Sequence, residues 1–219
     1  MIQWITQLFA SHKTASDTPE VHEHQKNNMK SVSNKFLIVG LGNIGAEYVN
    51  TRHNIGFKVL DFLAKKESLA FETVKLGALA EYKFKGRTFF LLKPNTYMNL
   101  SGKAVNYWCQ QLKIEKERLL ILTDDIALPF ETLRLKPKGS SGGHNGLKSI
   151  EGVLLTQEYG RLRMGVGSDF AKGRQADFVL SNFNEDEIGL IPFILNRSNE
   201  IIDCFCLEGI QQTMNKYNQ

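Results

Sequence analysis

The sequence predicts one α/β domain in which helices cover a largely buried β-sheet. After residue 35, short continuous apolar runs alternate with longer segments whose apolar residues recur at helical spacing. Continuous apolar runs are typical of strands that are covered on both faces. With 219 residues, 42% hydrophobic and 23% charged, the chain is long enough for one such domain. We assign residues 35–219 to this domain, and residues 1–34, which lack periodicity and are mostly polar, to a flexible N-terminal extension.

The first half of the domain contains clear local patterns. FLIVG at residues 36–40 predicts a buried strand. In residues 55–66 the apolar side chains share one helical face, and lysines in the last turn complement the helix dipole. Residues 82–94 predict a hairpin that turns at the Lys-Gly pair in its middle. The next helix is expected over residues 101–113, with Ser101 as its N-cap.

The second half continues the alternation. LLILTDD at residues 119–125 predicts a buried strand that ends in two acids. Two more strands are expected at residues 161–167 and 176–180, and helices at residues 144–155, 184–208 and 209–219. Three consecutive acids favour the N-terminus of the longest of these helices, whereas Pro192 is expected to bend or interrupt it.

The formal charge of +4 is concentrated in one segment. Between Leu133 and Arg174, eight basic residues accompany only three acidic ones, which gives this segment +5 and leaves −1 for the rest of the chain. A concentrated positive surface suits a polyanionic partner such as a nucleic acid. A solvated basic face explains the same count equally well, so charge alone leaves both interpretations open.

The cysteines and the hydropathy pattern exclude several classes of protein. Cys109, Cys204 and Cys206 form neither a disulfide framework nor a zinc-binding pattern. We therefore expect a reducing, cytoplasmic compartment. No run of 18 apolar residues is present, so the sequence predicts no membrane span.

The segment GLGNIG, from Gly40 to Gly45, satisfies the G-x-G-x-x-G pattern of dinucleotide-binding proteins. That fingerprint needs a helix that begins at the glycines, because the helix N-terminus receives the pyrophosphate. Here the polar stretch AEYVNTRHN follows, and helical periodicity starts only near Ile55. The acid required about 20 residues later is represented only by Asp61, inside that helix. We therefore expect the glycines to serve packing and a tight turn.

Polar side chains gather where the predicted strands end, which is where open α/β sheets bind ligands. The candidates are Asn43, Tyr48 and His53 after the first strand, Asn99 after the hairpin, Asp124 and Asp125 after LLILT, and Asn145 ahead of a helix. A lone histidine is more often a surface or structural residue. The carboxamides and carboxylates at neighbouring strand ends, however, predict a polar site that converges on His53.

Five segments in this order, TRHNIGF, TYMNLSGKAV, LTDDIALP, GSSGGHNGLKSI and RLRMGVG, resemble the motifs of the bacterial-type peptidyl-tRNA hydrolase family. The resemblance runs from Lys35 to the C-terminus. It implies a single-domain α/β three-layer sandwich with a mostly parallel (mixed) central sheet flanked by helices. It also implies that a monomeric enzyme hydrolyses the ester between a peptide and tRNA, with no metal and no cofactor.

The resemblance implies catalytic roles for three residues. His53 would be the general base that activates a water molecule, and Asp124 would orient its imidazole. Asn43 resembles an asparagine that holds the attacked carbonyl, since a carboxamide offers both a donor and an acceptor. Asp125 would point to the opposite face of its strand, and a solvent-facing or turn role suits it better.

Contacts with peptide and tRNA are implied in the same way. The implied substrate-binding residues are Tyr48, Met98, Asn99, His144 and Asn145, and the implied phosphate contacts are Lys136, Arg163 and Lys172. Core packing is the alternative explanation for Met98. Phosphate contacts position a nucleic acid without reading its sequence. We expect only one of Arg161 and Arg163 to face the tRNA surface.

Two alternatives stay open at the level of sequence. A non-catalytic RNA-binding relative on the same fold would keep the basic segment and tolerate the loss of His53. A nucleotide-cofactor oxidoreductase would use GLGNIG. Departures from the family pattern at Ile44 and Ala127 leave His53, Asp124 and the asparagines intact, and affect loop rigidity instead.

Overall fold

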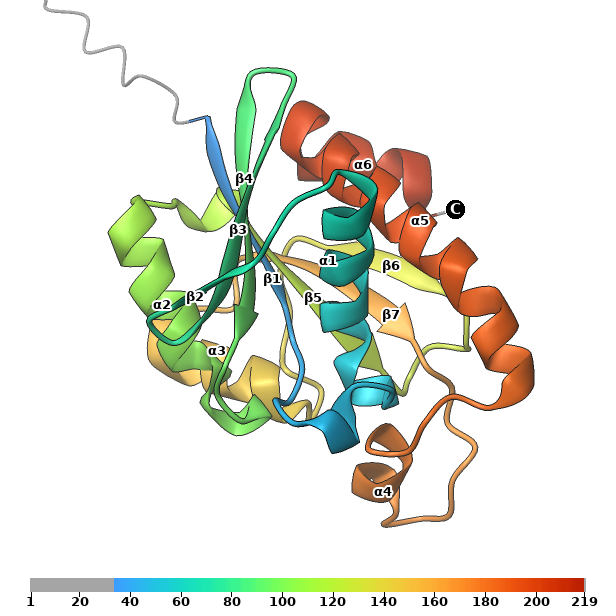
Figure 1. Ribbon diagram of the computed structural model, residues 1–219. Coiled ribbons are helices and arrows are strands. Elements are labelled where there is room, and N and C mark those ends of the chain that lie inside the picture. The colour runs from blue at the N-terminus through green and yellow to red at the C-terminus, as the bar shows by residue number, and fades with distance from the viewer. Residues whose placement is uncertain (1–33, 219) are drawn as a thin grey trace, which may run out of the picture. The chain divides into compact units, whose positions relative to one another are not determined.

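Seven strands form the central sheet, in the order β2-β3-β4-β1-β5-β7-β6 (Figure 1). The computed structural model describes residues 34–218, so the extension predicted over residues 1–34 lies outside the described residues apart from Asn34. The strands are β1 Lys35–Gly40, β2 Glu72–Val74, β3 Gly77–Phe84, β4 Arg87–Pro94, β5 Leu119–Asp125, β6 Leu133–Lys136 and β7 Gly160–Gly165. Strands β4, β1, β5 and β7 run parallel, and β2, β3 and β6 pair antiparallel with their neighbours. The sheet is therefore mixed with a parallel centre, as expected.

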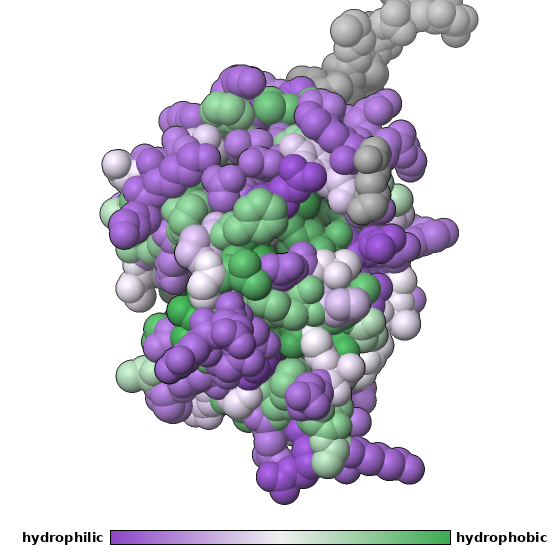
Figure 2. Space-filling view, turned by 90° about the vertical axis from the view of Figure 1, so that its right-hand side faces the viewer, coloured by the Kyte–Doolittle hydropathy of each residue, from purple (hydrophilic) through white to green (hydrophobic). Residues whose placement is uncertain are grey.

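Helices cover both faces of the sheet, which makes three layers (Figure 1). One face carries α1 Ile55–Lys66, α5 Glu185–Glu208 and α6 Ile210–Tyr217. The other face carries α2 Ser101–Leu112 and α3 Asn145–Leu154. The short helix α4 Gln175–Val179 lies beyond one end of the sheet. Four short 3-10 turns complete the described elements: η1 Ala46–Tyr48, η2 Arg52–Asn54, η3 Met98–Leu100 and η4 Lys116–Arg118. Hydrophobic side chains interrupt the hydrophilic surface in the view turned towards α5 and α6 (Figure 2). None of the helices in the described part of the chain combines the length and apolar character needed to cross a membrane.

Successive side chains of the central strands enter two separate cores. On β1, Phe36 and Ile38 pack towards α1 and α5, whereas Leu37 and Val39 pack towards α2 and α3. Burial on both faces explains why the strand sequences are continuously apolar rather than alternating.

The glycines of GLGNIG bring α1 close to the end of β1. A Cβ atom on Gly40 would lie 2.4 Å from the carbonyl oxygen of Gly56, in the first turn of α1. Gly45 has a φ of 120°, a conformation that favours glycine. The helix itself begins only at Ile55, after η1 and η2. The expected roles in packing and turning are confirmed, and the glycines do not open a helix as a dinucleotide site requires.

Three expectations about local structure are wrong. Residues 176–180 belong largely to α4 and not to a strand, because β6 already occupies the sheet edge beside β7. Ser101 does not cap α2: the N-cap is Leu100, and the Ser101 hydroxyl donates to the carbonyl oxygen of Met98. Pro192 does not interrupt α5, since it lies on an exposed stretch where water can bind the carbonyl group that it leaves free.

Candidate active site

Polar side chains from separate segments meet beyond the carboxyl ends of β1 and β5. His53 lies in η2, which joins the loop after β1 to α1. Asp124 is the penultimate residue of β5, and His144 is the N-cap of α3. Of the residues predicted at the strand ends, Asp124 is the one that the structure bonds to His53.

The Asp124 carboxylate lies between two imidazoles. His53 Nδ1 is 3.0 Å from both carboxylate oxygens, and His144 Nε2 is 2.9 Å from Oδ1. Asp124 is only 3% exposed. Burial alone would raise the pKa of this carboxyl, but the charges and hydrogen bonds of the two histidines outweigh burial and hold its pKa well below the usual value. Asp124 is therefore ionised at neutral pH.

The hydrogen bonds assign different tautomers to the two histidines. Because Asp124 is an acceptor, His53 carries its proton on Nδ1 and has an unprotonated Nε2. His144 Nδ1 instead accepts from the backbone N–H groups of Gly146 and Leu147, at 3.1 and 3.3 Å. Its proton must therefore lie on Nε2, from which it donates to Asp124. Only His53 thus offers a free lone pair.

His53, Asp124 and His144 together have the ligand types of a metal site, and their nearest ligand atoms lie within 4.8 Å of one another. A metal ion at His144 Nε2 would require the proton to move to Nδ1. Nδ1 faces two N–H donors of the α3 N-terminus, so that tautomer would break the helix cap. The arrangement therefore favours a hydrogen-bonded triad over metal coordination.

Asn43 is held beside this triad by Asn54. The side chain of Asn54 accepts from the Asn43 backbone N–H at 2.8 Å and donates to the Asn43 carbonyl oxygen at 2.9 Å. Asn43 Oδ1 accepts from the backbone N–H of Met98 at 2.9 Å. These contacts fix the orientation of the amide and leave its Nδ2 donors without a partner among the described residues. Asn43 can therefore present two N–H donors to a ligand.

The other implied substrate residues differ in exposure. Asn99 and Asn145 are exposed, and Tyr48 and His144 are half-buried. The Met98 side chain is only 4% exposed and belongs to the core beneath α2 and α3. Its backbone contact with Asn43 relates it to the site more directly than its thioether does.

The implied phosphate contacts lie on and beyond the β6–β7 edge of the sheet. Lys136 is half-buried on β6, and the exposed Lys172 precedes α4. The half-buried Arg163 forms an ion pair with Asp125. Asp125 also accepts from the backbone N–H of Ala127 at 2.8 Å, a turn contact that agrees with the expected turn role, but its side chain is 13% exposed and does not face solvent.

Alternation along β7 does not separate Arg161 from Arg163, so burial and not strand geometry leaves only one of them accessible. Residues two apart on a strand share a face, and Leu162 between them enters the opposite core. Arg161 is nevertheless 2% exposed, because its guanidinium donates to the carbonyl oxygens of Gly139, Ser140 and Gln157. Of the two, only Arg163 is partly accessible.

Two buried polar residues that flank His53 were not predicted from the sequence. Asn54 holds the Asn43 loop, and Arg52 is bonded to residues after α4. The signal in the sequence was weak, because TRHN resembles an exposed polar loop as much as a buried turn.

Comparison with known proteins gives a consistent result across sequence and structure. The family model described as peptidyl-tRNA hydrolase matches residues 37–219. The peptidyl-tRNA hydrolase of Parabacteroides distasonis is 57% identical over 184 residues, which cover 84% of this chain and 98% of the relative. The peptidyl-tRNA hydrolase of Porphyromonas gingivalis is 55% identical over 184 residues, which cover 84% of this chain and 100% of the relative.

Solved structures agree with the sequence comparison. The crystal structure of peptidyl-tRNA hydrolase from Acinetobacter baumannii matches with a TM-score of 0.79 at 34% identity, over 85% of this chain and 95% of that chain. The extent of these matches and the agreement in fold lead to one conclusion: the chain belongs to the peptidyl-tRNA hydrolase family.

Proposed function

We propose that this chain hydrolyses the ester bond between tRNA and a peptide or N-blocked aminoacyl group, which recycles tRNA released prematurely from ribosomes. The observation that carries the proposal is the Asp124–His53 pair, in which a buried carboxylate fixes the imidazole so that its unprotonated Nε2 is available as a base. The family relationship supplies the substrate class.

In the proposed mechanism, His53 Nε2 takes a proton from a water molecule whose oxygen attacks the ester carbonyl carbon. The carbonyl π electrons move to the oxygen and form a tetrahedral oxyanion. As the oxyanion collapses, the bond to the ribose oxygen breaks, and the imidazolium returns the proton to that oxygen. The products are a free peptide acid and a tRNA hydroxyl. Asp124 stabilises the imidazolium that exists between the two steps, as in hydrolase triads.

The Asn43 amide suits the developing oxyanion. Its Oδ1 is occupied by Met98, so the free Nδ2 faces the site with a fixed orientation. A preorganised donor of this kind contributes on the order of 10²- to 10³-fold in rate. We assign Asn99 and Asn145, both exposed, to the peptide backbone, and Tyr48 to stacking with the 3′-terminal base. Met98 holds the Asn43 amide through its backbone N–H, and His144 donates to Asp124.

The β6–β7 edge is proposed to hold the tRNA backbone. Arg134 lies opposite Arg163 in the antiparallel ladder, so both side chains share one face, and Lys136 follows on β6. Lys172 adds an exposed charge between β7 and α4. Contacts with phosphates alone suit an enzyme that acts on many tRNAs.

We also propose that the enzyme works as a monomer in the cytoplasm, with neither a metal nor another cofactor. The three cysteines are free thiols, which supports a reducing compartment. The tautomer of His144 supports a mechanism that depends on hydrogen bonds rather than on a metal ion.

The test is release of an N-acetylated amino acid from tRNA by the wild type and by His53→Ala, with and without EDTA. We expect release by the wild type in both conditions and a loss of about 10²- to 10⁴-fold in the variant. A folded wild type that binds tRNA but releases nothing would contradict the proposal and favour a non-catalytic RNA-binding protein. Loss of wild-type activity in EDTA would contradict the metal-free mechanism.

A further inference from the structure

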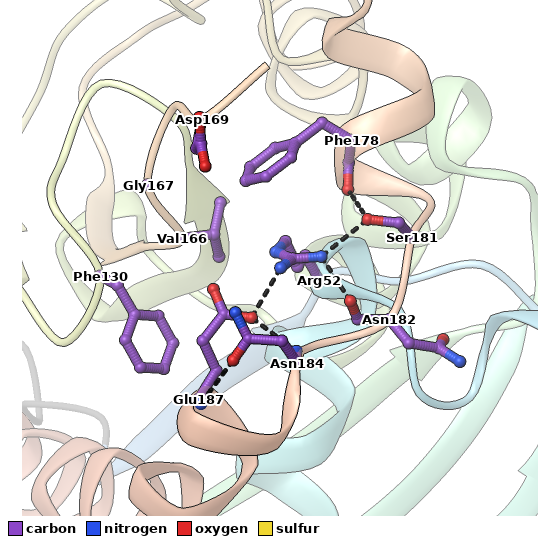
Figure 3. A pocket seen from close by; sticks show the side chains of 10 residues that line it. All are labelled: Arg52, Phe130, Val166, Gly167, Asp169, Phe178, Ser181, Asn182, Asn184 and Glu187. Atoms are coloured by element: carbon purple, nitrogen blue, oxygen red, sulfur yellow. Dashed lines mark hydrogen bonds and ion pairs between the residues drawn. The ribbon is translucent and has the colours of Figure 1, made fainter.

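Arg52 is a buried arginine next to His53. Its side chain is 7% exposed, and the guanidinium donates to Ser181 Oγ at 2.7 Å, to the Asn182 carbonyl oxygen and to Glu187 Oε2 at 2.6 Å (Figure 3). The same guanidinium lies 4.5 Å from the centre of the Phe178 ring. A planar arginine fork that makes several directed bonds fixes the relative position of the groups it joins.

These contacts connect two segments that are far apart in sequence. One is the η2 turn, in which Arg52 directly precedes His53. The other is the α4 segment, residues 167–182, which contains α4 and is followed by α5. The main chain joins the same two segments: the Arg52 N–H donates to the Ser181 carbonyl oxygen at 3.0 Å, and Thr51 forms an isolated β-bridge with Asn182.

The middle of the α4 segment, residues 168–177, is exposed except for the half-buried Phe170. Helix α4 has no buried residue. A polar cavity of about 410 Å³ lies between the segment and the body of the domain, and Arg52, Phe178 and Asp169 are among its lining residues (Figure 3). A segment with few buried apolar contacts moves at low energetic cost. The segment is therefore held at its two ends, by the Gly167 N–H bond to the Leu128 carbonyl oxygen and by Phe178 and the bonds of Arg52.

The α4 segment also carries the exposed basic side chains of Lys172 and Arg174. A polyanion that binds these side chains would fix the position of the α4 segment. A change in that position would alter the bonds that Arg52 makes with Ser181 and Asn182. We propose that Arg52 is a positioning residue that couples tRNA contact at the α4 segment to the placement of His53 for hydrolysis. This inference rests on the proposed function and predicts that an ester of whole tRNA is hydrolysed faster than the same ester without the tRNA body.

The test compares an N-acetyl-aminoacyl ester of tRNA with the same ester of adenosine, which has no phosphate for Lys172 or Arg174. In Arg52→Met we expect kcat on the tRNA ester to fall by about 10-fold or more, because displacement of a catalytic group by about 1 Å costs on the order of 10²-fold. The fall on the adenosine ester should be clearly smaller. KM for the tRNA ester should change little, since no phosphate contact is removed, and Arg52→Lys should restore part of kcat.

Arg197→Met is the matched control, because Arg197 also pairs with a glutamate and stacks on an aromatic ring, but on α5 and away from η2. It should leave both activities unchanged. If Arg52→Met does not fold, Glu187→Gln removes the charge and keeps an acceptor, and it should shift the tRNA-to-adenosine ratio in the same direction. Equal falls on both esters, or no fall on either, would overturn the inference. A wild type that cleaves neither ester would overturn the proposed function and this inference with it.

A spectroscopic measurement separates coupling from a general structural effect. Addition of tRNA trimmed of its single-stranded 3′ end should shift the imidazole NMR signals of His53 in the wild type, although this RNA cannot place an ester in the site. In Arg52→Met the trimmed tRNA should still bind, and the shift should be absent. A shift of the same size in the variant would overturn the coupling.

Discussion

His53 and His144 contact the Asp124 carboxylate through opposite nitrogens, Nδ1 of one ring and Nε2 of the other, with the ring centres 4.9 Å apart. A proton added to His144 would have to displace the two backbone N–H groups that bond to its Nδ1. A proton added to His53 Nε2 meets no such obstacle. The structure thus gives two similar side chains different hydrogen bonding: Nε2 of His53 has no partner among the described residues, whereas both nitrogens of His144 are bonded.

His144→Asn should test this difference. Asparagine can still cap α3, but its shorter side chain cannot reach Asp124 as the imidazole does. We expect the fold to persist and kcat/KM to fall by about 10-fold, the typical loss for one hydrogen bond to a charged group. The measurement is kcat/KM of the wild type, of His144→Asn and of His53→Asn under the same conditions. A loss as large as that of His53→Asn would show that His144 is itself the base.

Asp124→Asn should reduce kcat by about 10³- to 10⁴-fold, since an amide can stabilise neither the required tautomer nor the imidazolium. The same variant should change acid stability. Because the pKa of Asp124 is lowered on folding, its ionised form contributes stability that is complete above the unfolded value of about 3.9 and is lost as the pH falls towards the folded value. Urea unfolding of both proteins at several acidic pH values checks this. A difference between them that does not narrow with acid would count against the assigned role.

Asp203→Asn should stabilise the protein at neutral and alkaline pH. Burial is the main cause that raises the pKa of Asp203 to about 6, and its Oδ1 has no hydrogen-bond partner. A carboxyl with a raised pKa contributes stability below its unfolded value of about 3.9 and loses it as the pH rises through 6. We expect a gain of about 1 kcal/mol at alkaline pH, allowing for partial exposure, and little gain in acid. Thermal melts at the two extremes measure the difference. An equal gain at both would refute the titration argument.

Asp125→Asn should strengthen tRNA binding, because it releases Arg163 from its ion pair and leaves the positive charge for phosphate. Arg163→Gln should weaken binding and lower the slope of log K against log salt by about 1. Fluorescence titration of labelled tRNA at several salt concentrations gives both values. Arg197→Gln on α5 is the control and should leave the slope unchanged. Weaker binding by Asp125→Asn would mean that the carboxylate orients Arg163 rather than competing for it.

The central elements of the site were accessible from sequence because strand ends in an α/β sheet share an edge. His53 and Asp124 both follow strongly apolar runs, so their convergence followed from the fold class. Their partners were less accessible. Asn54 and Arg52 are ordinary loop residues by composition, and they are buried by contacts with residues distant in sequence.

The errors in the fold have a common physical origin. ADFVL has the apolar character of a strand, yet the position beside β7 is taken by β6, and the LRLK sequence of β6 was not assigned to a strand. Local composition does not report which edges are occupied, since that depends on contacts distant in sequence. The pairing of Asp125 with Arg163, 38 positions apart, is of the same kind.

The close approach of Gly40 and Gly56 has a consequence for the depth of the active site. Since α1 starts two residues after His53, the gap between the helix and β1 sets how far the imidazole stands above the sheet. A methyl group at position 56 would push α1 away from β1. His53 would then move away from Asp124, whose position is fixed by β5. Because Gly40 and Gly56 have no side chains, α1 can lie close enough to β1 for His53 to contact the Asp124 carboxylate.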